Sequence, residues 1–310
     1  MMSQNFKNVV LSAIKKQWQN TNPDKVMDYD KTMNSDKRIY YFAKLEDNLI
    51  KNMSPSTKSN FLSGSGNELK GKLKAIYSSS AMTYNLLGNN SLYIKNNYYD
   101  ITEGKFDIAY ERKVSPLKLG NPANLDACLT NDDEIIFFEM KMTEWLFNKP
   151  SQISASYFKA DNYFDKGSFV TFCDMAKALR AEREDGLAKY QCKFKHYDAF
   201  QMFKHTLGIY NEVCFQKKIS NVPKIKLINC IWTINDVSFF DGQMDLYHQY
   251  KDIEHSEQSE FEQFKDSASE VINLFREQGI KFDILLISVK DLISILVKDE
   301  FELIALRRYL

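Results

Sequence analysis

The sequence predicts an α/β (α+β) protein with a mixed β-sheet, helices on both of its faces and a helical N-terminal extension. Three short segments rich in β-branched and aromatic residues follow one another between residues 106 and 141, as in an antiparallel meander. Helix-like and strand-like segments then alternate towards the C-terminus, which favours parallel strands. No internal repeat and no Pro-rich or Gly/Ser-rich linker marks a domain boundary.

The composition is that of a globular protein large enough to bury its own core. Of 310 residues, 44% are apolar and 26% are charged, which argues against collagen, coiled coil, long disorder and a disulfide scaffold. Lys+Arg and Asp+Glu are both 41, so bulk positive charge cannot hold nucleic acid, although a local basic groove is compatible with these numbers.

The cysteines and the apolar segments predict a cytoplasmic protein with no membrane association. The five cysteines form no C-x-x-C pair and are odd in number, which argues against a zinc ribbon and a secreted disulfide framework. The N-terminus lacks the apolar core and cleavage site of a signal peptide. The longest apolar stretch is interrupted by Lys290 and Asp291, so it is too polar to span a bilayer.

Residues 1–60 are predicted to form a helical N-terminal extension, and residues 61–310 the main domain. Apolar residues from Phe6 to Trp18 recur at helical spacing, and residues 39–50 repeat that pattern. A further helix is expected from Glu68 to a stop at Gly88, with the serine run at 78–80 as a place where it bends or divides.

The remaining elements are predicted in chain order. The expected strands are 106–114, 125–130, 134–141, 224–234 and 281–289, and the expected helices are 151–181, 198–216, 256–275 and short C-terminal ones.

The hairpin LDACLTNDDEIIFFEMK carries the strongest chemical signal. Asp126 and Glu139 are equally far from a turn between Asp132 and Asp133, so a regular hairpin places them opposite each other on one face. Lys141, two residues further on, shares that face, although a single β-bulge would change this register. Two neighbouring carboxylates repel each other, and a divalent cation between them removes that cost.

Two acids and a lysine on one face suit metal-dependent hydrolysis of a phosphodiester. The acids, together with the carbonyl of Met140, offer hard oxygen ligands to Mg²⁺, with Mn²⁺ as a substitute. The cation would polarise the phosphoryl oxygen, and Lys141 would orient the attacking water or help to deprotonate it.

Asp126, the twelve-residue gap and Glu139-x-Lys141 resemble the PD-(D/E)XK nuclease superfamily. Its core of helix, three-strand meander, helix and strand matches residues 67–235, although Leu125 replaces the usual proline. The wider resemblance is to bacterial type II restriction-endonuclease-like proteins. It rests on the motifs GSGNEL (64–69), YSSSAMTYNLLG (77–88), YER (110–112), EMKMTEW (139–145) and YDAFQMFKHTLG (197–208).

The resemblance implies that Asp126, Glu139 and Lys141 are the catalytic triple. It also implies that Glu68 is the acid that relatives place on the first core helix, where it binds metal directly or through water. Gln201 and His205, one helical turn apart, would border the active site. Ser79 and Asn85 lie in the serine-rich motif and receive no chemical role.

Other readings of these residues remain open. Glu103-Gly-Lys105 and Glu111-Arg-Lys113 are also E-x-K motifs, and the second has Asp100 upstream; we favour Glu139 because the preceding IIFF run indicates a central strand. The pair could be a solvated hairpin with an ordinary Glu–Lys contact. Glu68 could be a first-turn helix acid and His205 a partly buried helix histidine. Glu144 could support the site from behind the metal ligands, but we favour a solvated charge.

The expected function is that of a Mg²⁺-dependent endonuclease that cuts DNA, such as a bacterial restriction or defence enzyme. Eight lysines between Lys189 and Lys226 suggest a basic groove beside the site, or else a solvated lysine face. By analogy we expect a homodimer and a companion methyltransferase. The alternatives are a nuclease for RNA or structured DNA, and a non-catalytic nucleic-acid- or protein-binding module on the same fold.

Overall fold

The computed structural model of the chain describes residues 4–32, 38–64, 69, 71–95, 98–147, 149–181, 189–217 and 224–310. Its centre is a six-stranded mixed sheet in the order β1-β2-β3-β4-β7-β8. The predicted antiparallel meander of β2, β3 and β4 and the predicted parallel pairing of β4, β7 and β8 are both observed, and β1 pairs antiparallel with β2 at the edge. The strands are β1 (Ser91–Ile94), β2 (Gly104–Val114), β3 (Ala123–Thr130), β4 (Glu134–Lys141), β7 (Lys224–Ile231) and β8 (Lys281–Ser288).

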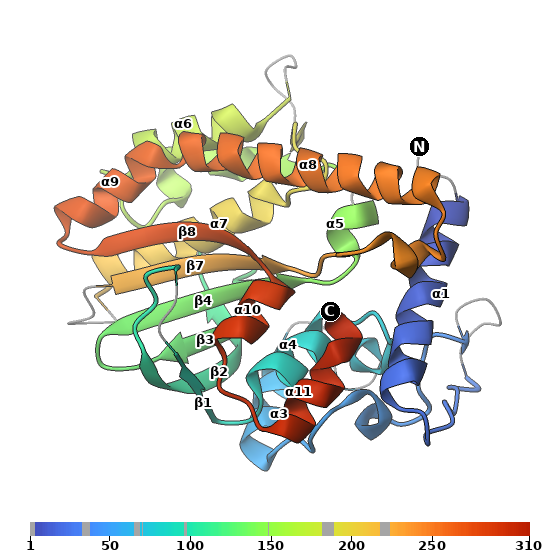
Figure 1. Ribbon diagram of the computed structural model, residues 1–310. Helices are drawn as coiled ribbons and strands as arrows, with labels where there is room; N and C mark the ends of the chain where they lie inside the picture. Colours follow the sequence, from blue (N-terminus) through green and yellow to red (C-terminus); the bar gives the residue numbers. More distant parts are fainter. Residues whose placement is uncertain are drawn as a thin grey trace.

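Helices cover both faces of this sheet, so the molecule has three layers (Figure 1). One layer holds α6 (Phe169–Leu179), α7 (Ala199–Tyr210), the C-terminal half of α8 (Met244–Ser267) and α9 (Ser269–Glu277). The other holds α1 (Gln4–Thr21), α3 (Pro55–Ser63), α4 (Ser79–Leu87), α10 (Val289–Ile295) and α11 (Glu300–Leu306). The short α5 (Glu144–Phe147) and the small β5–β6 sheet (Gln152–Ser154 with Lys189–Gln191) follow the central strands.

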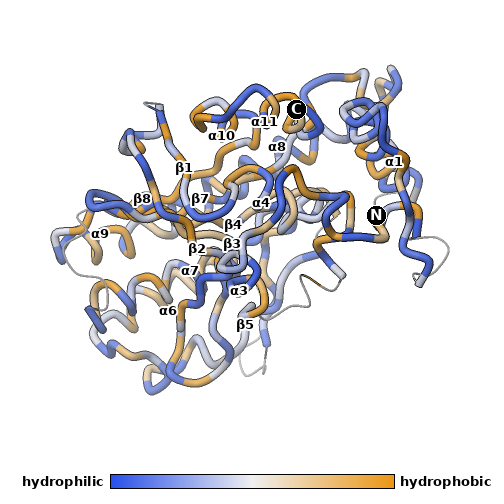
Figure 2. Tube along the Cα trace, turned by 90° about the horizontal axis from the view of Figure 1, so that it is seen from below, coloured by the Kyte–Doolittle hydropathy of each residue, from blue (hydrophilic) through white to orange (hydrophobic). Residues whose placement is uncertain are grey.

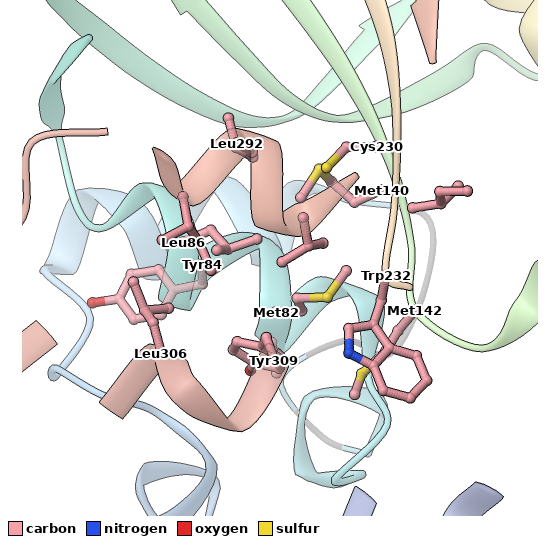
Figure 3. Close-up of a cluster of buried hydrophobic side chains, with 14 of the residues drawn as sticks. Met82, Tyr84, Leu86, Met140, Met142, Cys230, Trp232, Leu292, Leu306 and Tyr309 are labelled. Carbon is pink, nitrogen blue, oxygen red and sulfur yellow. The ribbon is translucent and has the colours of Figure 1, made fainter. Parts of the chain in front are cut away.

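Each layer has its own hydrophobic core. Figure 3 shows Met82 of α4, Met140 of β4, Trp232 after β7 and Leu306 of α11 converging in the core of the α4 layer. The N-terminal helix joins this same core through Phe6, Val10, Ile14 and Trp18, which are all buried. The proposed boundary at residue 60 stays a prediction.

Several sequence predictions of local structure are wrong. Among the described residues, the helix expected from Glu68 is observed only from Ser79 onward, where the Ser78 side chain caps it by accepting from the Ala81 N–H, and Lys72–Lys74 form a 3₁₀ turn. Only the 3₁₀ turn Leu45–Asn48 occurs in the segment expected to form a helix over 39–50. Tyr41 and Phe42 instead form isolated β-bridges, with Ala75 and Tyr29 respectively, and the Phe42 N–H donates to the Lys74 carbonyl.

Other predictions hold in part. Gly88 ends α4 with a positive φ of 90°, as expected for a helix stop. Of the helix expected over 151–181, only α6 is observed, after β5 and two 3₁₀ turns (Ala155–Phe158 and Ala160–Asn162). The helix expected at 256–275 is longer and is divided into α8 and α9. The short edge strand β1 was not predicted.

All five cysteines are buried and free. Every helix among the described residues is too short or too polar to cross a membrane.

Candidate active site

The predicted hairpin register is observed between β3 and β4. Ala127 pairs with Phe138, and Thr130 pairs with Ile135. The paired residues of β3 end at Ala127. Just beyond this pair, the Met140 N–H donates to Asp126 Oδ2 at 2.7 Å. A carboxylate therefore takes a backbone N–H of the neighbouring strand, and this bond fixes Asp126 next to Glu139.

Glu139 is held by two basic side chains. It is 3% exposed, and its Oε2 lies 3.0 Å from His205 Nε2, while its Oε1 lies 2.7 Å from Lys141 Nζ. Because an ionised carboxylate only accepts hydrogen bonds, His205 carries a proton on Nε2. The Glu139 carbonyl also accepts from Asn229 Nδ2 of β7 at 3.1 Å.

Lys141 joins the strand to the start of α7. Its Nζ donates to Gln201 Oε1 at 2.7 Å and lies 4.0 Å from Asp198 Oδ2. Asp198 is the N-cap of α7 and accepts from the Gln201 N–H, while Ser151 Oγ donates to the same carboxylate. The Asp198 carboxylate thus caps α7, and the first turn of that helix places Gln201 against Lys141.

The structure therefore brings together Asp126, Glu139, Lys141, Gln201 and His205, as predicted. Asp198 and Asn229 also belong to this set, and sequence reasoning missed both. The signal for Asp198 was an aspartate three residues before Gln201 at the start of a strong helix, which is a capping pattern. No sequence signal pointed to Asn229.

The two acids have opposite pKa shifts. Burial, reinforced by the nearby charge of Glu139, raises the pKa of Asp126 well above its usual value. Burial also acts to raise the pKa of Glu139, but Lys141 and His205 outweigh it and lower that pKa to about 2. Burial acts to lower the pKa of Lys141, yet the charges of Glu139, Asp198 and Glu144 raise it above the usual lysine value.

Glu144 is not the solvated charge that was expected. Its carboxylate accepts from the N–H groups of Met142 and Thr143 and from Ser79 Oγ at 2.8 Å. Ser79 of the serine-rich motif therefore ties α4 to the turn after β4. Asn85 has a structural role as well, because it bonds Ile50 N–H, the Asn48 carbonyl and Tyr309 Oη.

The competing E-x-K motif at Glu111 does not assemble with Asp100. Asp100 pairs with Lys224 and Lys281, the first residues of β7 and β8, at the opposite end of these strands from Glu139. Glu111 instead lies close enough to Asp126 for its charge to contribute to the raised pKa of that residue, and it accepts from Asn124 Nδ2. Its φ of 53° is unusual for a residue in a strand.

The basic groove predicted from the lysines between Lys189 and Lys226 included residues that do not lie beside the site. Lys193 and Lys195 are exposed just before α7. Lys226 is buried, however, and pairs with Asp283 at 3.3 Å, while Lys224 pairs with Asp100 at 3.2 Å. These two lysines balance acids at the far end of the sheet and belong to no groove beside the site.

The donor set fits a hard divalent cation. Asp126, which is half-buried, and Glu139, which is buried, are adjacent carboxylates, and a cation would relieve their repulsion. No set of three His, Cys, Asp or Glu side chains within the described ranges has the arrangement of a metal site. Mg²⁺ commonly binds one or two carboxylates and completes its shell with water, so two acids suffice. Glu68 lies outside the described residues.

Close packing of α7 against the sheet sets the position of Gln201 and His205. Gly208 of α7 faces Val114 of β2, and a Cβ at Gly208 would lie 2.5 Å from Val114 Cγ2 and 3.3 Å from the Val114 backbone carbon. Only glycine allows this approach.

We expect Gly208→Ala to destabilise the protein by roughly 1–3 kcal/mol, because the added methyl forces α7 away from β2. Thermal unfolding would measure the loss. The double variant Gly208→Ala/Val114→Ala should recover part of it, since it removes the nearest clashing atom. Equal stability of Gly208→Ala and the wild type would show that α7 is not packed this closely.

A mixed sheet of this order, with two acids and a lysine where two central strands separate, defines a restriction-endonuclease-like protein. The chain belongs to the family described as Restriction Endonuclease associating with ARP, whose model matches residues 12–222. No curated protein and no solved structure matches the chain.

Proposed function

We propose that this protein is a Mg²⁺-dependent endonuclease that hydrolyses DNA in bacterial restriction or defence. The observation that carries the proposal is the convergence of Asp126, Glu139 and Lys141 at the separating ends of β3 and β4. Membership of a restriction-endonuclease family supports a nuclease role.

Each side chain has a task that follows from its contacts. Asp126 and Glu139 would hold the cation, with the Met140 carbonyl and Glu68 as further ligands. Bound Mg²⁺ supplies Lewis-acid activation of the phosphoryl group and of a water. Lys141, kept protonated by its acidic neighbours, would offset negative charge in the transition state, and Gln201 holds its ammonium in place. His205 orients Glu139.

The partners are part of the proposal. Cutting both DNA strands requires two active sites, which favours a homodimer. The family description says that the endonuclease associates with ARP, so we propose ARP as a companion of this chain. A methyltransferase that protects host DNA is also expected.

The direct test is cleavage of supercoiled plasmid DNA with Mg²⁺. We expect the wild type to cut, a chelator to abolish cutting, and Lys141→Met to reduce the rate by roughly 10²-fold or more. Lys105→Met is the matched control, because Lys105 lies in an exposed E-x-K motif. RNA and branched DNA in parallel reactions identify the substrate.

Two results would contradict the proposal. Full activity of Lys141→Met would locate the chemistry elsewhere. A wild type that neither binds Mg²⁺ by calorimetry nor cuts any of these substrates would be a non-catalytic binding module.

A further inference from the structure

A row of exposed polar side chains leads from the small β5–β6 sheet to the start of α7. From residue 189 to residue 196 the side chains alternate between exposed and buried, and the buried Tyr190 and Phe194 pack in the core that α6 and α7 share. The end of this segment is fixed, because the Glu260 carboxylate accepts from the N–H groups of residues 195–197 at 2.7–3.0 Å. The exposed side chains form the polar stripe, which consists of Lys189, Gln191, Lys193 and Lys195.

The strand β5 adds a second amide beside the polar stripe. It pairs antiparallel with β6, and the register places Gln152 opposite Gln191. Residues directly opposite each other in such a pair point to the same face, and both glutamines are exposed. The next pair, Ile153 with Tyr190, is buried. Two amide side chains therefore stand next to each other on the outer face of a two-stranded ribbon.

The protein itself does not neutralise or satisfy these side chains. Among the residues that the structure describes, no carboxylate oxygen lies within 4.0 Å of a lysine ammonium of the polar stripe. Lys224 and Lys226, from the same lysine-rich part of the sequence, do have acidic partners. Within the described ranges, the side chains of Gln152 and Gln191 make no hydrogen bond. Three positive charges and two amides are therefore available to a molecule that docks here.

This face is continuous with the candidate active site. Ser151, directly before Gln152, donates through Oγ to Asp198 Oδ1 at 2.9 Å, and Asp198 Oδ2 lies 4.0 Å from Lys141 Nζ. Figure 2 shows β5 on the same side of the sheet as α6 and α7. Only Ser151 and Asp198 separate Gln152 from Lys141, so a polymer held at Lys141 reaches the ribbon.

We propose that Gln152 and Gln191 read base edges in the major groove of duplex DNA, while the lysines of the polar stripe hold its phosphates. The inference rests on the DNA cleavage proposed for Lys141. The major groove of B-DNA admits a two-stranded ribbon, and a glutamine amide forms two hydrogen bonds with adenine, at N6 and N7. Phosphate contacts position a protein on DNA, and base contacts specify the sequence. We therefore expect an A·T pair to be preferred at a fixed position in the bound site.

The chemistry of this face selects duplex DNA over other polyanions. An acidic protein or an anionic lipid surface would engage the lysines but would give the two adjacent amides no defined partners. The major groove of an RNA duplex is deep and narrow, so side chains cannot read its base edges. A DNA duplex offers phosphates to the lysines and base edges to the amides at the same time.

Phosphate binding is tested by fluorescence anisotropy with a labelled DNA duplex and a chelator, which prevents cleavage. Lys193→Ala/Lys195→Ala should weaken binding and lower the slope of log affinity against log salt concentration by about 1.8, because each lost phosphate contact removes about 0.9. Lys25→Ala/Lys290→Ala is the matched control, since both lysines are exposed outside the polar stripe, and it should leave the slope unchanged. Circular dichroism should show that both variants are folded.

Base reading is tested by selecting duplexes from a random library on the Lys141→Met protein with Mg²⁺ and sequencing those that bind. The selected duplexes should share an A·T pair at a fixed position. Adding Gln152→Ala or Gln191→Ala should reduce the preference for that pair by roughly 10-fold, because a bidentate contact is lost. Adding Gln258→Ala, at an exposed glutamine of α8, should leave the preference unchanged.

Four results would overturn the proposal: an unchanged salt slope in the double lysine variant, no base preference in the selection, an unchanged preference in both glutamine variants, or tighter binding of duplex RNA than of duplex DNA. Failure of the nuclease proposal is a separate result, because these measurements record binding alone. A wild type that leaves plasmid DNA uncut contradicts the proposed cleavage, whereas the salt slope and the base preference decide the role of the ribbon.

Discussion

Glu139→Gln is expected to reduce DNA cleavage by roughly 10²–10³-fold or more, the loss that follows removal of one group acting on transition-state charge. The amide keeps the shape of the side chain but loses the negative charge that faces Lys141 at 2.7 Å and His205 at 3.0 Å. It also removes one of the two carboxylates proposed to hold Mg²⁺.

The measurement compares initial rates of plasmid cleavage with those of Glu103→Gln, which alters the exposed E-x-K motif and should cut at the wild-type rate. Calorimetry should show weaker Mg²⁺ binding by Glu139→Gln alone, and circular dichroism should show that both variants are folded. Undiminished cutting by folded Glu139→Gln would remove Glu139 from the active site.

The second large effect concerns Glu257 of α8, a buried acid whose Oε2 has no hydrogen-bond partner. Burial and the charge of Glu260 raise the pKa of Glu257 to about 8. Between about pH 4.5 and pH 8 the folded protein keeps this proton, whereas the unfolded chain has released it. Glu257 therefore costs no stability below about pH 4.5, and its cost to the free energy of unfolding grows as the pH rises from there towards 8.

We expect Glu257→Gln to remove this cost and to stabilise the protein at pH 8 by at most about 5 kcal/mol relative to the wild type. Thermal unfolding at pH 5 and pH 8 measures it: the gain should be much larger at pH 8 than at pH 5. Glu262→Gln, an exposed change on the same helix, should show no such difference. An equal effect of Glu257→Gln at both pH values would contradict a proton held on Glu257.

Local patterns predicted the centre of the fold well. The strand 134–141 was predicted with the ends that the structure has, because the apolar run IIFF follows a polar turn. Counting residues from that turn also placed Asp126 beside Glu139, since the hairpin has no bulge between Ala127 and Thr130.

Features that depend on distant contacts could not be predicted. Segment 39–50 has helical spacing, but Phe42 pairs with the backbone of Lys74 and becomes extended. Lys226 looked like part of a basic surface because nothing in the sequence shows that Asp283 lies on the neighbouring strand. In the same way, Asn229 reaches the Glu139 carbonyl only because β7 pairs with β4.

Met140 links the two sides of the sheet through one residue. Its backbone N–H holds Asp126, while its side chain packs in the core that also contains Leu306 and Tyr309 of the C-terminal segment (Figure 3). The position of the Met140 backbone is therefore set by the packing of that core. The side chains of the C-terminal segment thus share a core with the residue whose N–H positions one of the two carboxylates on the opposite face.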